Sequence, residues 1–284
     1  NATTFYYHVG DGHVDHAYWG TPEAQTGSRP VIAATPSAPA TDVCGEAAAA
    51  LALMYLNYKD IDAAYATQCL NAAKQIYALG KNYMGRGSDG AGGTFYNSAT
   101  YLDDIAWGAV WLTIATGDRS YLAPVEGWLD QDADANYNRR WSPEWNNVAL
   151  FVLLKMYELT GNQKYYNGVV TNLTWFRDQS PKTPAGLPWL LKWGALRYAS
   201  CEAGFGYLAA KNLKYTGYTP TANLTMDYVL GTNPRRSSYL TNWGNNPPVH
   251  PHHRANEPII GGPTKGLLGG LVGGPDMQDN YVDN

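Results

Sequence analysis

Two segments of the chain, residues 111–122 and 155–166, share the pattern T-G-[DN]-x-x-Y. Each follows an apolar run whose spacing is that of one face of an α-helix. Gly117 and Gly161 suit the left-handed position that follows the last turn of a helix, because glycine adopts a positive φ without steric cost. The pattern therefore predicts that a helix ends at each of these two places.

The residue after each glycine is suited to begin a second helix. Asp118 and Asn162 are favourable N-cap residues, whose side chains accept a hydrogen bond from the backbone of the first turn. Ser142 and Pro143 form a similar start signal for the helix that leads into the second copy, with serine as N-cap and proline at the first helical position. Each copy is therefore predicted to be a helix, a tight turn and an antiparallel helix.

The same organisation extends in both directions. Residues 45–60 and 61–81 predict another helical hairpin, and so do 195–213 and 220–231. This gives about eight helices between residues 43 and 231, at a repeat length typical of stacked helical pairs. No stretch shows convincing β alternation. We therefore expect an all-α protein, either an open solenoid or a closed toroid of helical hairpins.

The two flanks differ from this helical part. Residues 1–41 and 232–284 are rich in Gly, Pro, Asn and His, and we expect them to form long ordered loops. Loops of that length are usually functional or linkers. The chemically unusual residues of the chain lie in these two flanking loops. This favours a closed ring in which the loops gather at one opening.

Composition narrows the kind of ligand. A net charge of −4 without a long basic run argues against nucleic acid. No apolar run is long enough to cross a membrane. The 22 Tyr and 10 Trp against 5 Phe suggest sugars, which need flat apolar faces together with hydrogen-bonding edges. A tyrosine-rich core is the alternative.

Residues 242–254, NWGNNPPVHPHHR, hold three histidines and an arginine behind three prolines. The cluster could bind a metal, pack in a core or contact a polar ligand. No cysteine or carboxylate is interleaved at ligand spacing, which disfavours zinc. Neutral histidine both donates and accepts hydrogen bonds, arginine presents a fixed fork of donors, and proline limits the flexibility of both. His250 and His253 could be structural only.

Residues 238–254 resemble the histidine signature of glycoside hydrolase family 9, the cellulase family. The matching positions are Ser238, Leu240, Thr241, Gly244, Asn246, His252 and Arg254. Four further segments resemble the family in the same order along the chain, namely residues 8–23, 101–118, 186–200 and 267–284. Asp104 stands where the family usually has Glu.

The resemblance implies an (α/α)6 toroid with long ordered loops, a secreted enzyme without a required cofactor, and hydrolysis of β-1,4-glucosidic bonds with inversion. By match to the family, His252 and Asp283 belong to the catalytic centre. The implied substrate-binding residues are His16, Trp193, Arg197, Tyr198 and Arg254. Asp103 and Asp104 match residues that bind calcium in many members, although a carboxylate pair at a helix N-terminus is equally explained by the helix dipole.

The family's catalytic carboxyls have no match here. Its D-A-G-D base element would precede Asn1, and its general acid would lie nine positions after Asp283. Residues 1–284 are therefore expected to be one partial catalytic domain with an incomplete ring, inactive when expressed alone. An appended carbohydrate-binding module would lie outside the chain. The alternative is a non-catalytic glucan-binding relic without those carboxylates.

Overall fold

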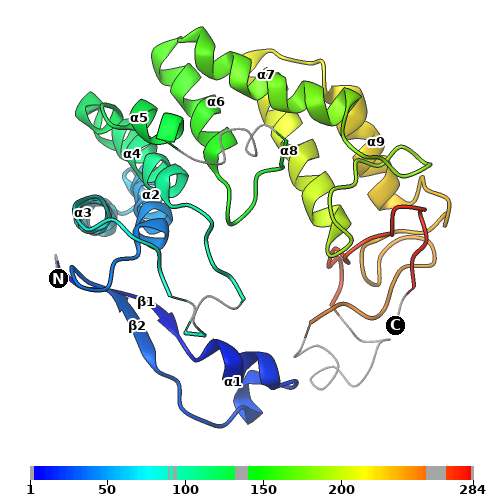
Figure 1. Ribbon diagram of the computed structural model, residues 1–284, viewed down its shortest axis with the longest axis horizontal. Coiled ribbons are helices and arrows are strands. Elements are labelled where there is room, and N and C mark those ends of the chain that lie inside the picture. The colour runs from blue at the N-terminus through cyan, green and yellow to red at the C-terminus, as the bar shows by residue number, and fades with distance from the viewer. Residues whose placement is uncertain (1–2, 89, 92–94, 132–139, 254–266, 283–284) are drawn as a thin grey trace. The chain divides into compact units, whose positions relative to one another are not determined.

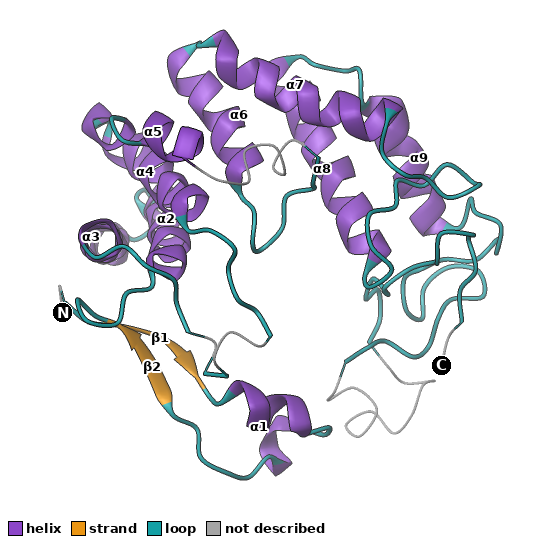
Figure 2. Cartoon of the chain, in the orientation of Figure 1, coloured by secondary structure: helices purple, strands orange, loops and turns teal. Residues whose placement is uncertain are grey.

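The computed structural model describes residues 3–88, 90–91, 95–131, 140–253 and 267–282. Within them the chain is mostly helical and contains one two-stranded sheet (Figures 1 and 2). The chain divides into two compact units, each made of three stretches. The first unit comprises Asn1–Ala17, Gly27–Asn138 and Trp145–Gly161, and the second comprises Tyr18–Thr26, Arg139–Glu144 and Asn162–Asn284.

The first unit is built around α2, which packs against α3 and α4, while α4 also packs against α6. Its elements are β1 (Phe5–Val9), α1 (Gly12–Ala17), β2 (Val31–Ala34), α2 (Thr41–Tyr58), α3 (Ala63–Asn82), α4 (Leu102–Thr116), a 3₁₀ helix (Arg119–Leu122), α5 (Val125–Gln131) and α6 (Ala149–Thr160). Helices α2 and α4 approach each other at glycines. A Cβ on Gly45 would lie 2.2 Å from the carbonyl oxygen of Asp104. This close approach brings the first turn of α2 beside the first turn of α4.

The second unit is built around α8, which packs against α9 and α7. Its elements are a 3₁₀ helix (Pro22–Ala24), α7 (Gln163–Asp178), α8 (Ala195–Leu213) and α9 (Thr219–Leu230). The loops after α9 join the core, because Tyr239 and Val272 are buried in one cluster with Leu196 and Tyr228. Among the residues described, no helix is long and apolar enough to cross a membrane.

The predicted helix ends are confirmed. Gly117 and Gly161 follow α4 and α6 with φ values of 75° and 67°. The side chain of Asn162 accepts the backbone N–H of Lys164 and caps α7. Asp118 caps in the same way, but the helix that it begins is a short 3₁₀ helix rather than an α-helix.

The predicted start of α6 at Ser142 and Pro143 is wrong, because the helix begins at Ala149. The side chain of Asp103 accepts the backbone N–H of Val148 at 2.9 Å, and Asn147 accepts that of Ala149 at 3.3 Å. The helix is therefore started by a carboxylate from α4, which is distant in sequence, rather than by the local Ser-Pro signal.

The prediction of loops without strands in residues 1–41 is also wrong. Strands β1 and β2 form an antiparallel pair, drawn in orange in Figure 2, with an irregularity in register between Tyr6 and His8. The run FYYHV of β1 carries aromatic residues on both faces, so it lacks the alternation by which a half-buried strand is recognised. Long ordered loops are confirmed in the described part of residues 232–284.

Candidate functional site

The first unit contains a cavity of about 470 Å³ bordered by α1, by the first turns of α2 and α4, and by the loops beside them. Its lining combines carboxylates, histidines and aromatic rings. The residues are Tyr7, His8, Gly12, Asp15, His16, Asp42, Val43, Glu46, Gly87, Ser88, Phe95, Tyr96, Ser98, Asp104 and Trp145. Concave sites with a few convergent polar groups are the usual form of a small-molecule site.

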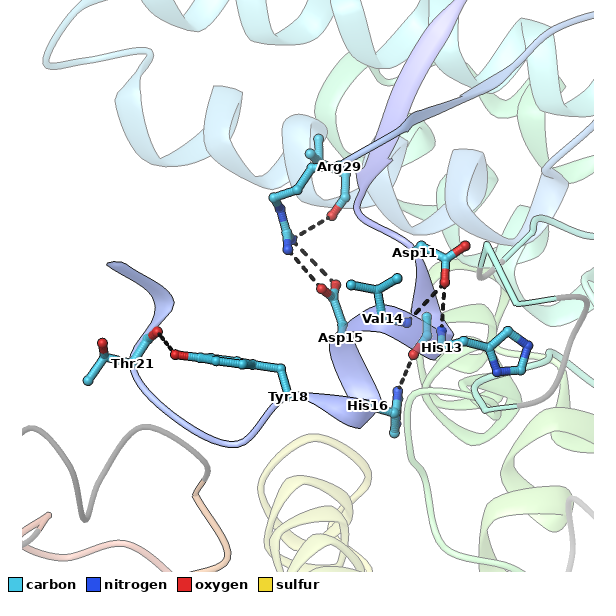
Figure 3. A network of polar contacts seen from close by, with 10 residues as sticks. Asp11, His13, Val14, Asp15, His16, Tyr18, Thr21 and Arg29 are labelled. Carbon is cyan, nitrogen blue, oxygen red and sulfur yellow. Dashed lines mark hydrogen bonds and ion pairs between the residues drawn. The ribbon is translucent and has the colours of Figure 1, made fainter. Parts of the chain in front are cut away.

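Helix α1, short as it is, is held at both ends by charged side chains (Figure 3). Asp11 accepts the backbone N–H groups of His13 and Val14 at 2.9 and 3.0 Å, which caps the helix. Asp15 forms an ion pair of 2.7 Å with Arg29, and Arg29 also donates to the carbonyl oxygen of Val9. These contacts fix α1 to the end of β1.

His16, a predicted substrate-binding residue, lies in the wall of this cavity. Its ring is stacked on that of Phe95, with centroids 3.4 Å apart and planes 4° from parallel. Its Nδ1 lies 2.8 Å from the carbonyl oxygen of Gly12. Because that oxygen can only accept a hydrogen bond, Nδ1 carries a proton and donates it in this contact.

Three carboxylates come from the first turns of α2 and α4. Asp42 and Glu46 are one helical turn apart on α2, and Asp104 approaches them where α2 and α4 meet. Removal from bulk water, together with the charges of Asp103 and Asp42, raises the pKa of Glu46 to about 7. Sequence reasoning missed Asp42 and Glu46, although their spacing of four on an otherwise alanine-rich helix was a usable signal.

The predicted calcium ligands are buried. Asp103 caps α6 through Val148, and Asp104 lies in the cavity wall. Among the residues described, no group of three or more His, Cys, Asp or Glu side chains is arranged to hold a metal ion. The aspartate pair alone is too small a donor set for calcium, which takes six to eight oxygen ligands. Calcium at Asp103 and Asp104 stays a prediction that rests on the resemblance.

Exposed aromatic rings lie at the edge of the cavity. Tyr96 and Trp145 meet edge to face, with centroids 5.8 Å apart. Both rings are exposed, and both line the cavity. Flat exposed rings beside hydrogen-bonding groups suit the C–H faces of a sugar.

In the second unit, His252 lies between two exposed tryptophans. Its ring centroid is 5.5 Å from that of Trp19 and 5.1 Å from that of Trp193, which it meets almost perpendicularly. Trp193 is 71% exposed, which is unusual for so large an apolar side chain. Two residues predicted from separate segments are thus brought into contact.

The loop that carries His252 is folded by its own asparagines. Asn242 and Asn246 have positive φ, which asparagine tolerates better than most residues. Asn242 donates its backbone N–H to Pro248, and the side chain of Asn246 donates to Ser237. These contacts fold the loop as far as Pro248, four residues before His252.

Arg197 and Tyr198 lie in the first turn of α8, close to Trp193 in sequence. The Arg197 guanidinium lies over the Tyr198 ring at 4.3 Å and donates to its hydroxyl. The same nitrogen, Nη2, forms an ion pair with Glu144 at 3.4 Å. Burial and the Glu144 carboxylate raise the pKa of Tyr198, so its hydroxyl keeps its proton at neutral pH. Sequence reasoning missed Glu144. The predicted residues Arg254 and Asp283 lie outside the described residues.

The described residues form a mostly helical protein whose cavity combines carboxylates, histidines and exposed aromatic rings. The model of the family described as "Glycosyl hydrolase family 9" matches residues 1–284. The chain therefore belongs to glycosyl hydrolase family 9.

Similar proteins agree with this assignment. The chain is 34% identical to Endoglucanase A of Bacillus pumilus and 36% identical to an endoglucanase of Dictyostelium discoideum, over 99% and 97% of its length. It spans 46% and 40% of those relatives, so it corresponds to about half of the longer proteins or less.

Solved structures agree as well. The cellulase Cel9M of C. cellulolyticum matches with a TM-score of 0.92 and 42% identity, over 100% of this chain and 67% of that one. The endoglucanase of the termite Nasutitermes takasagoensis matches with a TM-score of 0.88 and 34% identity, over 100% of this chain and 68% of that one. These are (α/α)6 cellulase domains, so the predicted all-α (α/α)6 fold class is confirmed.

Proposed function

We propose that the protein takes part in the hydrolysis of β-1,4-glucosidic bonds in cellulose and related β-glucans. The observation that carries this proposal is the cavity of the first unit, where four carboxylates, two histidines and aromatic rings converge. A glucan chain presents apolar C–H faces and equatorial hydroxyls, and this lining offers partners to both. One similar structure is a complex of Cel9M with cellobiose, and another is a complex of CelQ with cellotriose.

Several of the site residues that the resemblance implies belong to the second unit, and each can be given a role by itself. We propose that Trp193 stacks on a sugar ring and that Arg197 and Tyr198 donate hydrogen bonds to its hydroxyls. His252, exposed between Trp19 and Trp193, would contact the reacting sugar. Arg254 and Asp283 keep their proposed roles in substrate binding and catalysis, and both lie outside the described residues.

Inversion is the finer part of the proposal. It requires one carboxyl that protonates the leaving oxygen and another that activates water, roughly 6.5–9.5 Å apart. Proton NMR of fresh hydrolysis products gives the stereochemistry directly. Release of the α-anomer supports inversion, and release of the β-anomer contradicts it.

Non-catalytic glucan binding is the second candidate, because exposed rings such as Trp145 and Trp193 can stack on a sugar without cleaving it. Titration calorimetry with cellohexaose, xylohexaose and mannohexaose tests binding, and mass spectrometry of the same mixtures detects cleavage. Preferred binding of cellohexaose with shorter products supports the hydrolase. Preferred binding without products supports the binding domain, and tighter binding of xylan or mannan oligomers contradicts both.

The proposal extends to the location of the protein and to a further domain. Cellulose is an insoluble polymer outside the cell, so we propose that the protein is secreted. An appended carbohydrate-binding module would hold such an enzyme on its substrate, which is an effect of local concentration. Secretion is tested by fractionating a culture of the source organism, and association with the cells rather than the medium contradicts it.

A further inference from the structure

Glu144 lies between two donors that hold its carboxylate from both sides. Its Oε1 accepts the indole N–H of Trp141 at 2.8 Å, and its Oε2 lies 3.4 Å from Nη2 of Arg197. The side chain of Glu144 is only 9% exposed, whereas that of Arg197 is 47% exposed. An indole can only donate and a guanidinium stays charged, so both partners require an acceptor here. Glu144 is thus a fixed, shielded carboxylate beside a cation that reaches solvent.

Trp141 is itself anchored to the helices. Its carbonyl oxygen accepts the side-chain amide of Asn172, a fully buried residue of α7, at 3.0 Å. Its ring meets that of Tyr198 edge to face, with centroids 5.2 Å apart. The segment that carries Glu144 is therefore held to α7 through Asn172 and to α8 through Tyr198.

Arg197 uses one nitrogen for its inward contacts. Nη2 donates to the Tyr198 hydroxyl and forms the ion pair with Glu144, while the guanidinium plane lies over the Tyr198 ring. Among the residues described, no other hydrogen bond or ion pair engages this side chain. Both of these contacts are made by Nη2, and the guanidinium holds Nε and Nη1 in a fixed fork beside it. An arginine held on one edge can present the other edge to a ligand without first losing rotamer freedom.

We propose that Glu144 is a positioning residue, which holds Arg197 in the orientation that binds the hydroxyls of a glucan. The inference deepens the proposed function and rests on the role given there to Arg197. Glu144 itself does not touch the sugar. It accepts a hydrogen bond from Trp141 and forms an ion pair with Arg197, and so ties the orientation of the guanidinium to the helices.

The first test compares isosteric variants in binding. Glu144→Gln keeps the shape and can still accept from Trp141, but it removes the charge that orients Arg197. Calorimetric titration with cellopentaose should show about tenfold weaker binding for Glu144→Gln. The control Glu158→Gln breaks an ion pair with Lys155 at the surface of α6 and should bind as the parent protein does.

A double-mutant cycle separates positioning from direct contact. If Glu144 acts through Arg197, then Arg197→Ala weakens binding and adding Glu144→Gln causes no further loss. Independent, multiplicative losses would overturn the inference. So would unchanged binding of Glu144→Gln alongside weakened binding of Arg197→Ala. If Arg197→Ala also binds normally, the proposed role of Arg197 fails instead.

A measurement without ligand keeps the inference testable if the parent protein binds no glucan. In ¹H–¹⁵N spectra the Arg197 Nε–H signal should shift in Glu144→Gln and stay unchanged in Glu158→Gln. An unchanged Arg197 signal overturns the inference. Trp141→Phe, which removes the indole donor and leaves the charge, serves as a second variant if Glu144→Gln does not fold. It should weaken binding by about threefold and shift the same Arg197 signal, and an unchanged signal again overturns the inference.

Discussion

A carboxyl group is enclosed in the middle of α8. Glu202 is fully buried, and neither of its oxygens has a hydrogen-bond partner among the residues described. Desolvation raises its pKa well above the ordinary value of 4.5, and its charge would act on the buried Tyr218 beside it. The native protein therefore keeps this carboxyl protonated at a pH where the unfolded chain releases the proton.

Glu202 should make the protein less stable as the pH rises. Below pH 4.5 the Glu202 carboxyl is protonated in both the native and the unfolded state, so it does not lower the free energy of unfolding there. Above it only the native state holds the proton, so the free energy of unfolding falls by up to about 1.4 kcal/mol per pH unit until the native pKa is reached. Glu202→Gln should remove this slope, as measured by urea unfolding between pH 4 and 8.

Glu46 should also lower the free energy of unfolding as the pH rises, but only up to its native pKa of about 7. Glu46→Gln should therefore flatten the curve between pH 4.5 and 7 and leave the higher range unchanged. Glu158→Gln is the matched control, because its carboxylate is paired with Lys155. Identical pH profiles of Glu202→Gln and this control would show that Glu202 is ionised in the native state.

In the complete catalytic domain, His252→Ala should lower turnover without lowering stability. The side chain is exposed and contacts Trp19 and Trp193 only at its ring, so its loss leaves no cavity. A hydrogen-bonding group aimed at the reacting sugar is worth about 10²-fold in rate. Steady-state kinetics and thermal melting of the same preparations separate the two effects. A lower melting temperature with normal turnover would make His252 structural.

At single residues, a motif can point to side chains that the fold brings together, but local sequence misses partners that only the fold unites. His252 and Trp193 come from distant segments, and their rings are in contact in the structure; their roles in a site stay predictions. Glu144 and Glu46 acquire their chemistry from neighbours on other elements, Arg197 in one case and Asp103 in the other. Such proximity cannot be seen in local spacing.

At the scale of elements, the cap of α7 is a local interaction that the sequence predicts completely. The Asn162 side chain accepts the N–H of Lys164 at 3.0 Å. Asn162→Ala should therefore cost about 1 kcal/mol of unfolding free energy in urea denaturation. Asn71→Ala, an exposed change inside α3, is the control and should be neutral or slightly stabilising, because alanine favours helix interiors. Equal effects of both changes would mean that the cap contributes nothing.

The start of α6 and the β1–β2 pair are features that local sequence signals did not predict. Ser142 and Pro143 form a sound start signal, but the N–H groups at Val148 and Ala149 find their acceptors in Asp103 and Asn147 instead. The two strands are stabilised by pairing across more than twenty residues of intervening chain. In both cases a tertiary partner overrides the local preference.

At the scale of the whole molecule, each unit has a core of its own, but neither is one continuous stretch of chain. The chain passes from one unit to the other five times. The helical periodicity predicted the hairpins, and the resemblance supplied the ring to which they belong. The division into interleaved units was not predicted, because it depends on which helices share a core. Separable domains usually meet at a single exposed linker, so these units should not unfold independently.

The three cysteines can show whether the two units unfold together, because none is in a disulfide and they are distributed over both units. Cys44 and Cys69 are buried in the first unit, and Cys201 is partly buried in the second. Burial raises the pKa of Cys44 to about 12 and that of Cys201 to about 11, so the native thiols are protonated and react slowly. Alkylation therefore measures the opening of the surrounding structure.

Iodoacetamide labelling across a urea gradient, with peptide mass spectrometry, should show Cys44 and Cys201 reacting at one common midpoint. The chain passes between the two units five times, so unfolding one unit also releases segments that hold the other in place. Labelling without urea gives the native baseline, which matters for the partly exposed Cys201. A lower midpoint at Cys201 would show that the second unit opens separately. In that case α8 and the loops that carry Trp193 and His252 would open while α2, α3 and α4 remain folded.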